Sequence, residues 1–472
     1  MALRYCARLI FGVLQHPDGH RTARAIVHRL LDRARGGVLE LREPDGTVHR
    51  LGREGAREPL HAVLEVRSAD FYRRLLRGSA GLAEAYIDGL WTSPDLVALV
   101  RLGARNGEAM DRPRRWLRPL VGPARAIGRA RNTVARSRKQ ISAHYDLGND
   151  LFALFLDERM MYSSAIFPRA DATLEEASLH KIETICRKLA LRPSDHLLEI
   201  GTGWGSLAVH AAAEHGCRVT TATISREQHD HVVAKVRAAG LEGQVDVVLR
   251  DYRELRGRYD KLVSVEMIEA VGWKDFGTFF ARCSDLLVPD GLMLLQAITT
   301  SDRAYDVEKG NRSFMATHIF PGGCLPSSKV IARCVERHTD MRTIAAQDIS
   351  AHYAETLRHW RARFDARRGE LAALGYDDRF ERLWELYLAY CEAGFRERRI
   401  GDVQVLLAKP RWRADAPAMT GRADALEAVW GRRERAVIAT PASATAPPTA
   451  VIADGTSPSA TQPTSAATGG TA

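Results

Sequence analysis

A glycine-rich turn preceded by an acidic residue is the segment of this sequence best suited to chemistry. Residues 197–205, Leu-Leu-Glu-Ile-Gly-Thr-Gly-Trp-Gly, form a short apolar run and then place glycine at every second position. Glycine lets the backbone approach a ligand closely, and Glu199 would lie at the carboxyl end of a strand, where open α/β sheets bind ligands. The spacing is G-x-G-x-G, whereas a dinucleotide turn reads G-x-G-x-x-G. The turn predicts a nucleotide-like ligand, with close packing of a helix on a strand as the alternative.

The elements around this turn alternate regularly between strand and helix patterns. Apolar runs predict strands at 196–200, 218–224, 245–250, 260–266 and 291–298, with helical patterns between them. This alternation predicts an α/β fold with a doubly wound, mostly parallel sheet, whose ligands bind at the carboxyl ends of the strands. Motifs at those ends would therefore face one cleft: 201–205, 223–228, 251–252, 266–269 and 296–298.

The flanking regions differ from this central part. Residues 38–51 predict a hairpin, since Asp45-Gly46 supports a type I′ turn, and residues 71–90 predict a helix. Ten Arg or Lys against one acid mark 111–139 as a basic linker. From 436 onward Ala, Thr, Ser and Pro predominate, which predicts a disordered tail.

Composition narrows the class of protein. The 472 residues suggest two domains, and no apolar run approaches the roughly 18 residues that span a membrane. We expect no signal peptide. The seven cysteines contain no C-x-x-C pair, which argues against a disulfide framework or a zinc site and for a reducing cytoplasm. The net charge of +10 suggests a polyanionic partner, either nucleic acid or an acidic membrane surface.

Several motifs occur in a fixed order along the chain. They are His-Tyr-Asp-Leu-Gly-Asn-Asp-Leu-Phe at 144–152, Met-Tyr-Ser-Ser-Ala at 161–165, the glycine turn, Thr-Ile-Ser-Arg-Glu-Gln at 223–228, Ile-Phe-Pro-Gly-Gly-Cys-Leu-Pro-Ser at 319–327, His-Tyr-Ala-Glu-Thr-Leu at 352–357 and Ala-Gly-Phe at 393–395. Together they resemble the cyclopropane-fatty-acyl-phospholipid synthase family, which includes the mycolic acid cyclopropane synthases. The resemblance implies a Rossmann-like, class I methyltransferase fold that uses S-adenosylmethionine (SAM). The predicted domains are an N-terminal α+β lipid-associated domain (1–110), the basic linker (111–139), the catalytic domain (140–415) and the tail (436–472).

The resemblance also implies a SAM site. Its residues would be Tyr162, Ser163, Glu199, Gly201, Gly203, Gly205, Thr223, Ile224, Gln228 and Tyr252. Gln228 would replace the acid that many SAM enzymes place after the second strand, although such a residue is otherwise often a solvated helix position. Either tyrosine could instead be a core aromatic.

The implied reaction needs a methyl donor and a base. An alkene attacks the sulfonium methyl, and the resulting carbocation must be kept from water until it loses a proton. Loss from the added methyl closes a cyclopropane, whereas loss elsewhere leaves a methyl or methylene branch. In the family a bound bicarbonate is the base, and Glu269, Tyr353 and the backbone of Ile298 match three of its contacts. A surface salt bridge is the alternative role for Glu269.

Two positions depart from the family pattern. Ser164 stands where the commoner members have cysteine, and Gln296 stands where they have histidine. Both side chains still offer hydrogen bonds, so bicarbonate could bind without a titratable imidazole beside it. The resemblance predicts transfer of the SAM methyl to the double bond of an unsaturated phospholipid acyl chain, which gives a cyclopropane fatty acid. The departures leave two alternatives open, a 10-methyl type of branch completed by a partner reductase and a non-catalytic lipid-binding protein.

The expected partners follow from the same resemblance. They are unsaturated phospholipid acyl chains and an anionic membrane surface, contacted peripherally at the cytoplasmic face through the 111–139 segment, for which a solvated linker is the alternative. A homodimer is left open. A nucleic-acid amino-methyltransferase is disfavoured because no [NDS]-P-P-[FYW] motif is present.

Overall fold

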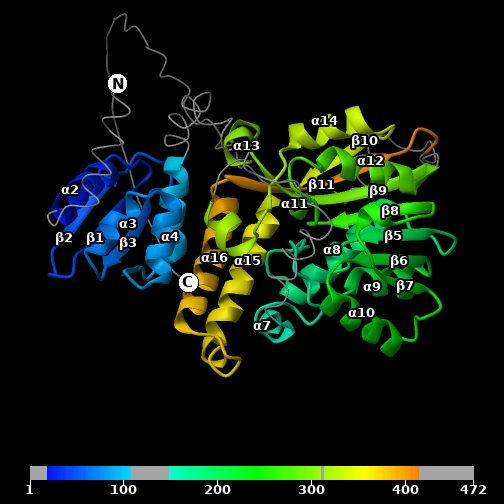
Figure 1. Ribbon diagram of the computed structural model, residues 1–472, viewed down its shortest axis with the longest axis horizontal. Helices are drawn as coiled ribbons and strands as arrows, with labels where there is room; N and C mark the ends of the chain where they lie inside the picture. The colour runs from blue at the N-terminus through cyan, green and yellow to red at the C-terminus, as the bar shows by residue number, and fades with distance from the viewer. Residues whose placement is uncertain (1–18, 108–147, 310–312, 414–472) are drawn as a thin grey trace, which may run out of the picture. The chain divides into compact units, whose positions relative to one another are not determined.

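The computed structural model describes residues 19–107, 148–309 and 313–413 (Figure 1). The basic segment 111–139, the tail 436–472 and residues 144–147 lie outside the described residues. The predicted boundaries at 110 and 140 also fall in an undescribed part, so the division into domains stays a prediction.

A seven-stranded sheet organises the region from 196 to 408. Its order is β10-β11-β9-β8-β5-β6-β7. The strands are β5 (His196–Ile200), β6 (Arg218–Thr223), β7 (Val245–Leu249), β8 (Tyr259–Val265), β9 (Leu287–Thr300), β10 (Arg342–Asp348) and β11 (Ile400–Ala408). The five strands from β7 to β9 run parallel, whereas β11 pairs antiparallel with both β9 and β10. The α/β prediction is thus confirmed, and the antiparallel pair adds an edge that we did not predict.

Ten α-helices are described between residues 149 and 396, and most of them contact the strands of the sheet (Figure 1). They are α7 (Asn149–Ala153), α8 (Leu174–Leu189), α9 (Ser206–His215), α10 (Arg226–Ala238), α11 (Ile268–Val271), α12 (Phe276–Leu286), α13 (Asp302–Glu308), α14 (Ser328–His338), α15 (Ser350–Ala366) and α16 (Asp378–Arg396). Local chemistry sets several helix starts. Thr173 and Glu176 form a reciprocal capping box at α8, and the side chain of Ser225 caps α10.

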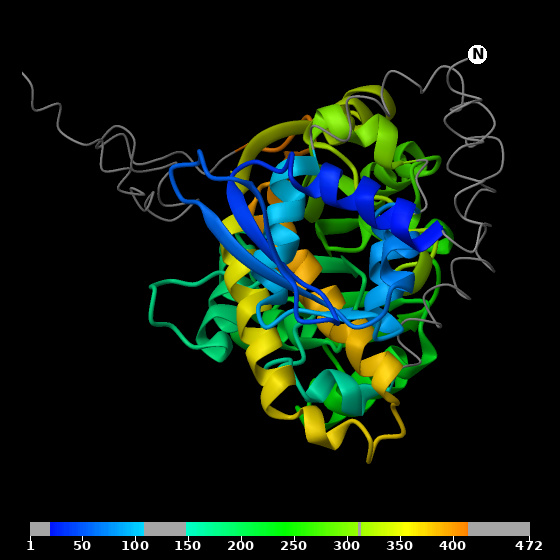
Figure 2. The same cartoon turned by 90° about the vertical axis from the view of Figure 1, so that its left-hand side faces the viewer.

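A smaller four-stranded sheet, of order β2-β1-β3-β4, lies in the N-terminal region and is drawn in blue in Figure 2. Its elements are α2 (Gly19–Leu31), β1 (Gly37–Arg42), β2 (Val48–Arg53), β3 (Leu60–Val66), α3 (Asp70–Leu75), α4 (Ser79–Ile87) and β4 (Trp91–Thr92). Parallel pairing of β1 with β3 and antiparallel pairing of β1 with β2 give the expected α+β character.

Two local predictions in this region are wrong. The hairpin exists, but Gly46 alone of its turn has a positive φ (84°), whereas a type I′ turn needs a positive φ at Asp45 as well. The predicted helix at 71–90 is broken, because Gly78 adopts a φ of 85° between α3 and α4. Helix α4 then packs against α16, where the Tyr86 hydroxyl donates to Glu385 at 2.6 Å. None of the described helices has the length and apolar character needed to cross a membrane.

Candidate active site

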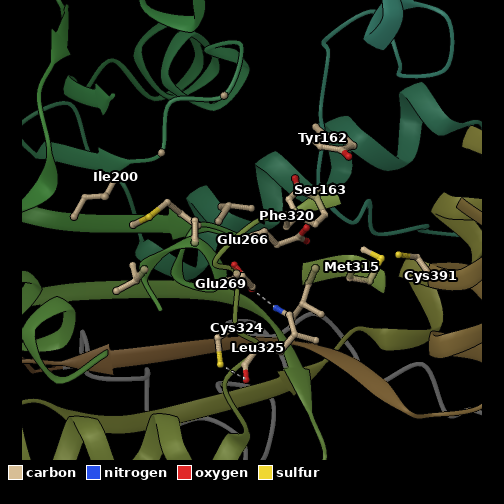
Figure 3. A pocket seen from close by; sticks show the side chains of 18 of the residues that line it. Tyr162, Ser163, Ile200, Glu266, Glu269, Met315, Phe320, Cys324, Leu325 and Cys391 are labelled. Atoms are coloured by element: carbon tan, nitrogen blue, oxygen red, sulfur yellow. Dashed lines mark hydrogen bonds between the residues drawn. The ribbon is translucent and has the colours of Figure 1, made fainter. Parts of the chain in front are cut away.

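A cavity of about 430 Å³ opens at the carboxyl ends of the parallel strands (Figure 3). Its walls come from the ends of β5, β6, β8 and β9, from the segment before α8, and from α15 and α16. This is the place that the parallel topology predicts for a ligand. The cavity has two halves, one around the glycine turn and one around Glu266 and Glu269.

The three glycines of the turn have different roles. All have positive φ, 100° at Gly201, 53° at Gly203 and 79° at Gly205. A Cβ on Gly203 would meet no described atom within 4 Å, and Gly203 lines the cavity, so this position leaves room for a ligand. A Cβ on Gly205 would lie 2.7 Å from Val232, and Gly205 does not line the cavity. Gly205 is thus required for close packing, whereas the open space at Gly203 is what the predicted ligand site needs.

Polar side chains beside the turn are held by neighbouring strands. Glu199 accepts a hydrogen bond of 2.6 Å from Thr221 on β6, and burial raises the pKa of Glu199 to about 8. The Thr223 hydroxyl donates to Gln228 Oε1 at 2.9 Å. Gln228 is 6% exposed, so it lies in the cavity wall and is not a solvated helix residue. Ile224 lines the cavity beside them.

The aromatic side chains predicted for the SAM site also line the cavity. The Tyr252 hydroxyl is buried and has no hydrogen-bond partner among the described residues, while its ring meets Phe279 edge-on at 5.5 Å. The hydroxyls of Tyr162 and Tyr387 lie 2.7 Å apart. Ser163 Oγ accepts from the buried Lys181 Nζ at 2.8 Å. The predicted SAM residues, Gly205 excepted, thus line one cavity.

Glu266 dominates the other half of the cavity. It follows β8 directly and has a φ of 48°, which is strained for a residue other than glycine. Its Oε1 accepts from the Ser164 backbone N–H at 2.9 Å and from Gln296 Nε2 at 2.7 Å, and its Oε2 accepts from the Tyr353 hydroxyl at 2.7 Å. Three donors therefore stabilise a carboxylate in this position, even though burial raises the pKa of Glu266.

Glu269 lies beside Glu266 on the short helix α11, past the end of β8 (Figure 3). Its Oε1 accepts from the Ile298 backbone N–H at 2.6 Å. Its Oε2 is buried and has no hydrogen-bond partner among the described residues. Burial, and then the charge of Glu266, raise the pKa of Glu269 to about 8. This geometry is that of a carboxyl group in a pocket and not of a surface salt bridge.

The five residues matched to a bicarbonate site divide into two groups. Glu269, Tyr353 and Ile298 line the cavity, whereas Ser164 and Gln296 are fully buried behind it. The Ser164 hydroxyl donates to the Ala165 carbonyl at 3.0 Å, so only its backbone N–H reaches Glu266.

Gln296 belongs to a buried polar network behind Glu266. Besides donating to Glu266, it lies 3.2 Å from Asp402 Oδ2 and accepts from Gln404 Nε2 at 2.9 Å. The direct catalytic roles that we expected for Ser164 and Gln296 stay predictions. The contacts described here are those of groups that hold Glu266.

Sequence reasoning assigned no role to Glu266, Lys181 or Tyr387. Glu266 stood at a strand end that we predicted to face the cleft, which was a usable signal. Lys181 gave none, because a lysine in an amphipathic helix normally faces solvent. It is fully buried here, its pKa is lowered to about 8 by burial, and Glu266 is the first of the carboxylates that oppose this shift.

Comparisons with known proteins identify the family of this chain. The family model described as mycolic acid cyclopropane synthetase matches residues 132–405. Tuberculostearic acid methyltransferase UfaA1 of Mycobacterium tuberculosis (strain ATCC 25618 / H37Rv) is 40% identical over 383 residues, which cover 79% of this chain and 88% of the relative. Cyclopropane-fatty-acyl-phospholipid synthase of Escherichia coli (strain K12) is 38% identical over 352 residues, covering 74% of this chain and 88% of the relative.

A solved structure links the fold to the ligand. Mycolic acid cyclopropane synthase CmaA1, complexed with SAH and CTAB, matches with a TM-score of 0.54 and 32% identity, covering 58% of this chain and 98% of that chain. The SAH in that structure supports SAM as the cofactor of this protein. The protein is a SAM-dependent methyltransferase that belongs to the mycolic acid cyclopropane synthetase family.

Proposed function

We propose that this protein methylates the double bond of an unsaturated phospholipid acyl chain, with Glu266 as the base, and that the product is branched. One observation carries the proposal. The groups that the family resemblance assigns to a bicarbonate ion, Tyr353, Gln296 and the segment at Ser164, all donate to the carboxylate of Glu266. A carboxylate presents the same kind of planar oxyanion as bicarbonate, so a side chain of the protein stands in for the ion.

The residues present do not fit a separate bicarbonate in this arrangement. Three of its expected donors are engaged by Glu266, and the Ile298 N–H is engaged by Glu269. The proton acceptor is a group fixed in the cavity wall.

The cavity supplies what the reaction requires. SAM supplies an electrophilic methyl group when it is bound. The glycine turn, Glu199 and Gln228 would hold the SAM molecule. As the C–C bond forms, the S–C bond breaks, and a carbocation remains on the neighbouring carbon. Glu266 accepts the proton that leaves, and the burial that raises its pKa makes this carboxylate a stronger base. The aromatic wall around Tyr162 and Tyr387 excludes water that would trap the cation.

Two further observations favour a branched product. Ser164 and Gln296 depart from the residues that accompany bicarbonate in the commoner members, and both contact Glu266 instead. The relative that shares 40% identity over 79% of the chain is named a tuberculostearic acid methyltransferase and is a methyl-branching enzyme. A product that keeps a double bond would need a partner reductase to become a saturated branch.

Product analysis tests this proposal. Lipids from a host that expresses the protein would be analysed by mass spectrometry with fragmentation that separates ring from branch isomers. We expect methyl- or methylene-branched chains that are absent from a host with an empty vector. A purely cyclopropane product would contradict the branched outcome. An unchanged lipid profile, with SAM binding intact by calorimetry, would favour the non-catalytic alternative.

Cyclopropane formation is the second candidate. It is favoured by the 38% identical cyclopropane-fatty-acyl-phospholipid synthase and by Glu269 Oε2, which accepts no hydrogen bond from the described residues and offers, when ionised, a second proton acceptor in the same cavity. The two candidates share the methyl transfer. Direct loss of a proton from the added methyl closes the ring. Loss from a neighbouring chain carbon leaves a methyl-branched alkene, and a 1,2-hydride shift followed by loss from the methyl leaves a methylene branch.

We also propose that the protein works at the cytoplasmic membrane surface. The substrate chains lie in a bilayer, and the basic segment 111–139 would add about 1 kcal/mol per charge near anionic headgroups. Vesicle pelleting should depend on anionic lipid and weaken with salt. Pelleting that is indifferent to both would contradict a role for this segment.

A further inference from the structure

Four metal-ligating side chains meet between α8 and α9, which pack against each other beside the sheet (Figure 1). Glu183 and Cys186 lie on α8, and His210 and His215 lie on α9. One ligand atom each of Cys186, His210 and His215 lies within 4.8 Å of the others. Glu183 Oε2 lies 3.2 Å from His210 Nε2 and 3.1 Å from His215 Nε2. None of the four lines the catalytic cavity.

We infer that this cluster is a structural Zn²⁺ site with Cys186, His210, His215 and Glu183 as its ligands. Tetrahedral zinc takes thiolate, imidazole and carboxylate, with Zn–N bonds of about 2.1 Å, so neighbouring nitrogen and oxygen ligands lie about 3.4 Å apart. Glu183 Oε2 already lies at nearly this distance from each imidazole nitrogen, 3.2 Å from His210 and 3.1 Å from His215, whereas the ligand atoms of Cys186, His210 and His215 lie within 4.8 Å of one another and would move closer on binding. A set of four protein ligands leaves no open position, which is typical of structural and not of catalytic zinc.

Charge and burial fit such a site. Cys186 is fully buried, whereas Glu183 and the histidines are partly exposed, so an ion could enter from the solvent side. The other oxygen of Glu183 faces Arg187 at 3.6 Å, which orients the carboxylate while leaving Oε2 toward the histidines. Binding would convert the neutral thiol of Cys186 to a thiolate and release its proton.

A second cluster in the N-terminal sheet provides a contrast. His28, Glu43 and His49 also bring three ligand atoms together. There, however, Arg24 Nε donates to Glu43 Oε1 at 2.8 Å, and another Arg24 nitrogen lies 3.3 Å from His49 Nε2. A guanidinium already provides the positive charge, so we expect this cluster to bind no metal. In the α8–α9 cluster the guanidinium of Arg187 also faces the carboxylate, but at 3.6 Å and on Oε1, so Oε2 and the histidine nitrogens stay on the other side.

The site would connect two parts of the SAM-binding machinery. Helix α9 begins directly after the glycine turn, and α8 carries Lys181, which donates to Ser163. A metal ion that joins the helices would fix the turn relative to Ser163. We therefore expect metal removal to lower thermal stability.

Cobalt titration of the full-length protein without a histidine tag tests this inference. The protein would be stripped with a chelator, titrated with Co²⁺, and then competed with Zn²⁺. We expect one ion per chain, the visible spectrum of tetrahedral Co²⁺, and a near-ultraviolet thiolate-to-cobalt band. Cys186→Ser should remove that band. His210→Gln should weaken binding at least about 100-fold, the upper end of the loss from even an outer-shell change.

Matched variants make the result decisive. Cys217→Ser changes another buried cysteine, whose thiol donates to Ala211, and His49→Gln changes the second cluster. Both should leave the spectrum and affinity unchanged. SAM binding by calorimetry would verify that each variant is folded. The inference would be overturned if the wild-type protein gave no tetrahedral Co²⁺ spectrum. It would also be overturned if His210→Gln kept the wild-type affinity, or if Cys217→Ser removed the thiolate band.

Discussion

The two halves of the cavity solve different physical problems. The half around the glycine turn is open, because small residues with positive φ keep side chains away from a bulky ligand. The half around Glu266 and Glu269 is crowded and holds two carboxyl groups side by side, with the pKa of each raised by burial. Binding a cofactor requires space, whereas proton removal from a carbocation requires a fixed base and no water. Variants in one half should therefore change SAM affinity, and variants in the other half should change turnover.

The largest effect is expected for Glu266→Gln. Glutamine keeps the shape and can still accept hydrogen bonds, but it cannot accept the proton. We expect turnover to fall about 10²–10³-fold, as for the loss of a general base. The SAM dissociation constant from calorimetry should stay unchanged, because Glu266 lies in the other half. Near-normal turnover would show that the base lies elsewhere.

Glu269→Gln should have the next largest effect. We expect a loss of turnover of about tenfold or more, because one of the two carboxyl groups beside the reacting carbon is lost. SAM affinity should stay nearly unchanged, because the amide oxygen of glutamine can still accept from the Ile298 N–H. Steady-state kinetics beside calorimetry give both numbers. An equal loss of turnover and SAM affinity would place Glu269 in the cofactor half and contradict the division.

Two glycine variants test whether each glycine is needed to leave space for SAM or to allow close packing within the protein. Gly203→Ala places a methyl in the open part of the cavity, so we expect SAM affinity to fall about tenfold, or about 1.4 kcal/mol. Gly205→Ala forces Val232 to move and should lower the free energy of unfolding by about 1–3 kcal/mol. Calorimetry and thermal melts check the pair. The reverse pattern would mean that the roles of the two glycines are exchanged.

The paired carboxyl groups also predict a pH dependence of stability. The pKa of Glu269 rises from an ordinary 4.5 to about 8 in the folded state. The unfolded chain therefore releases this proton first, and the folded state loses stability as pH rises from about 5 to 8. Glu269→Gln has no such proton, so at pH 8 its Tm should exceed that of wild type by about 2 °C or more. Parallel Tm curves for both proteins would contradict the raised pKa.

The smallest effect is expected for Ser164→Cys, which restores the commoner residue. The contact with Glu266 uses the backbone N–H, and within the described part of the chain the hydroxyl donates to the carbonyl oxygen of Ala165. Turnover should change by less than about threefold, since the backbone contact persists. A large gain or loss would assign the Ser164 side chain a direct role in the reaction.

The same contrast explains what could be predicted from the sequence. The glycine turn, Glu199 and Gln228 lie within about one βαβ unit, so strand alternation and spacing placed them in one site. The arrangement around Glu266 depends on Ser164, Gln296 and Tyr353, which are far apart in sequence. It also depends on the φ of 48° at Glu266, which no pattern reveals. The family resemblance identified Ser164, Gln296 and Tyr353 as site residues. It did not identify Glu266 as the group to which they donate hydrogen bonds.

The central claim is that the proton acceptor is the side chain of Glu266 and not a bound ion. The most direct measurement is the methylation rate of the purified wild-type enzyme in carbonate-free buffer, followed by addition of bicarbonate at constant pH and ionic strength. Because Glu266 engages the donors that bicarbonate would use, we predict full activity without bicarbonate and no increase when it is added. A rate that collapses in carbonate-free buffer and recovers with bicarbonate would contradict the assignment of Glu266 as the base.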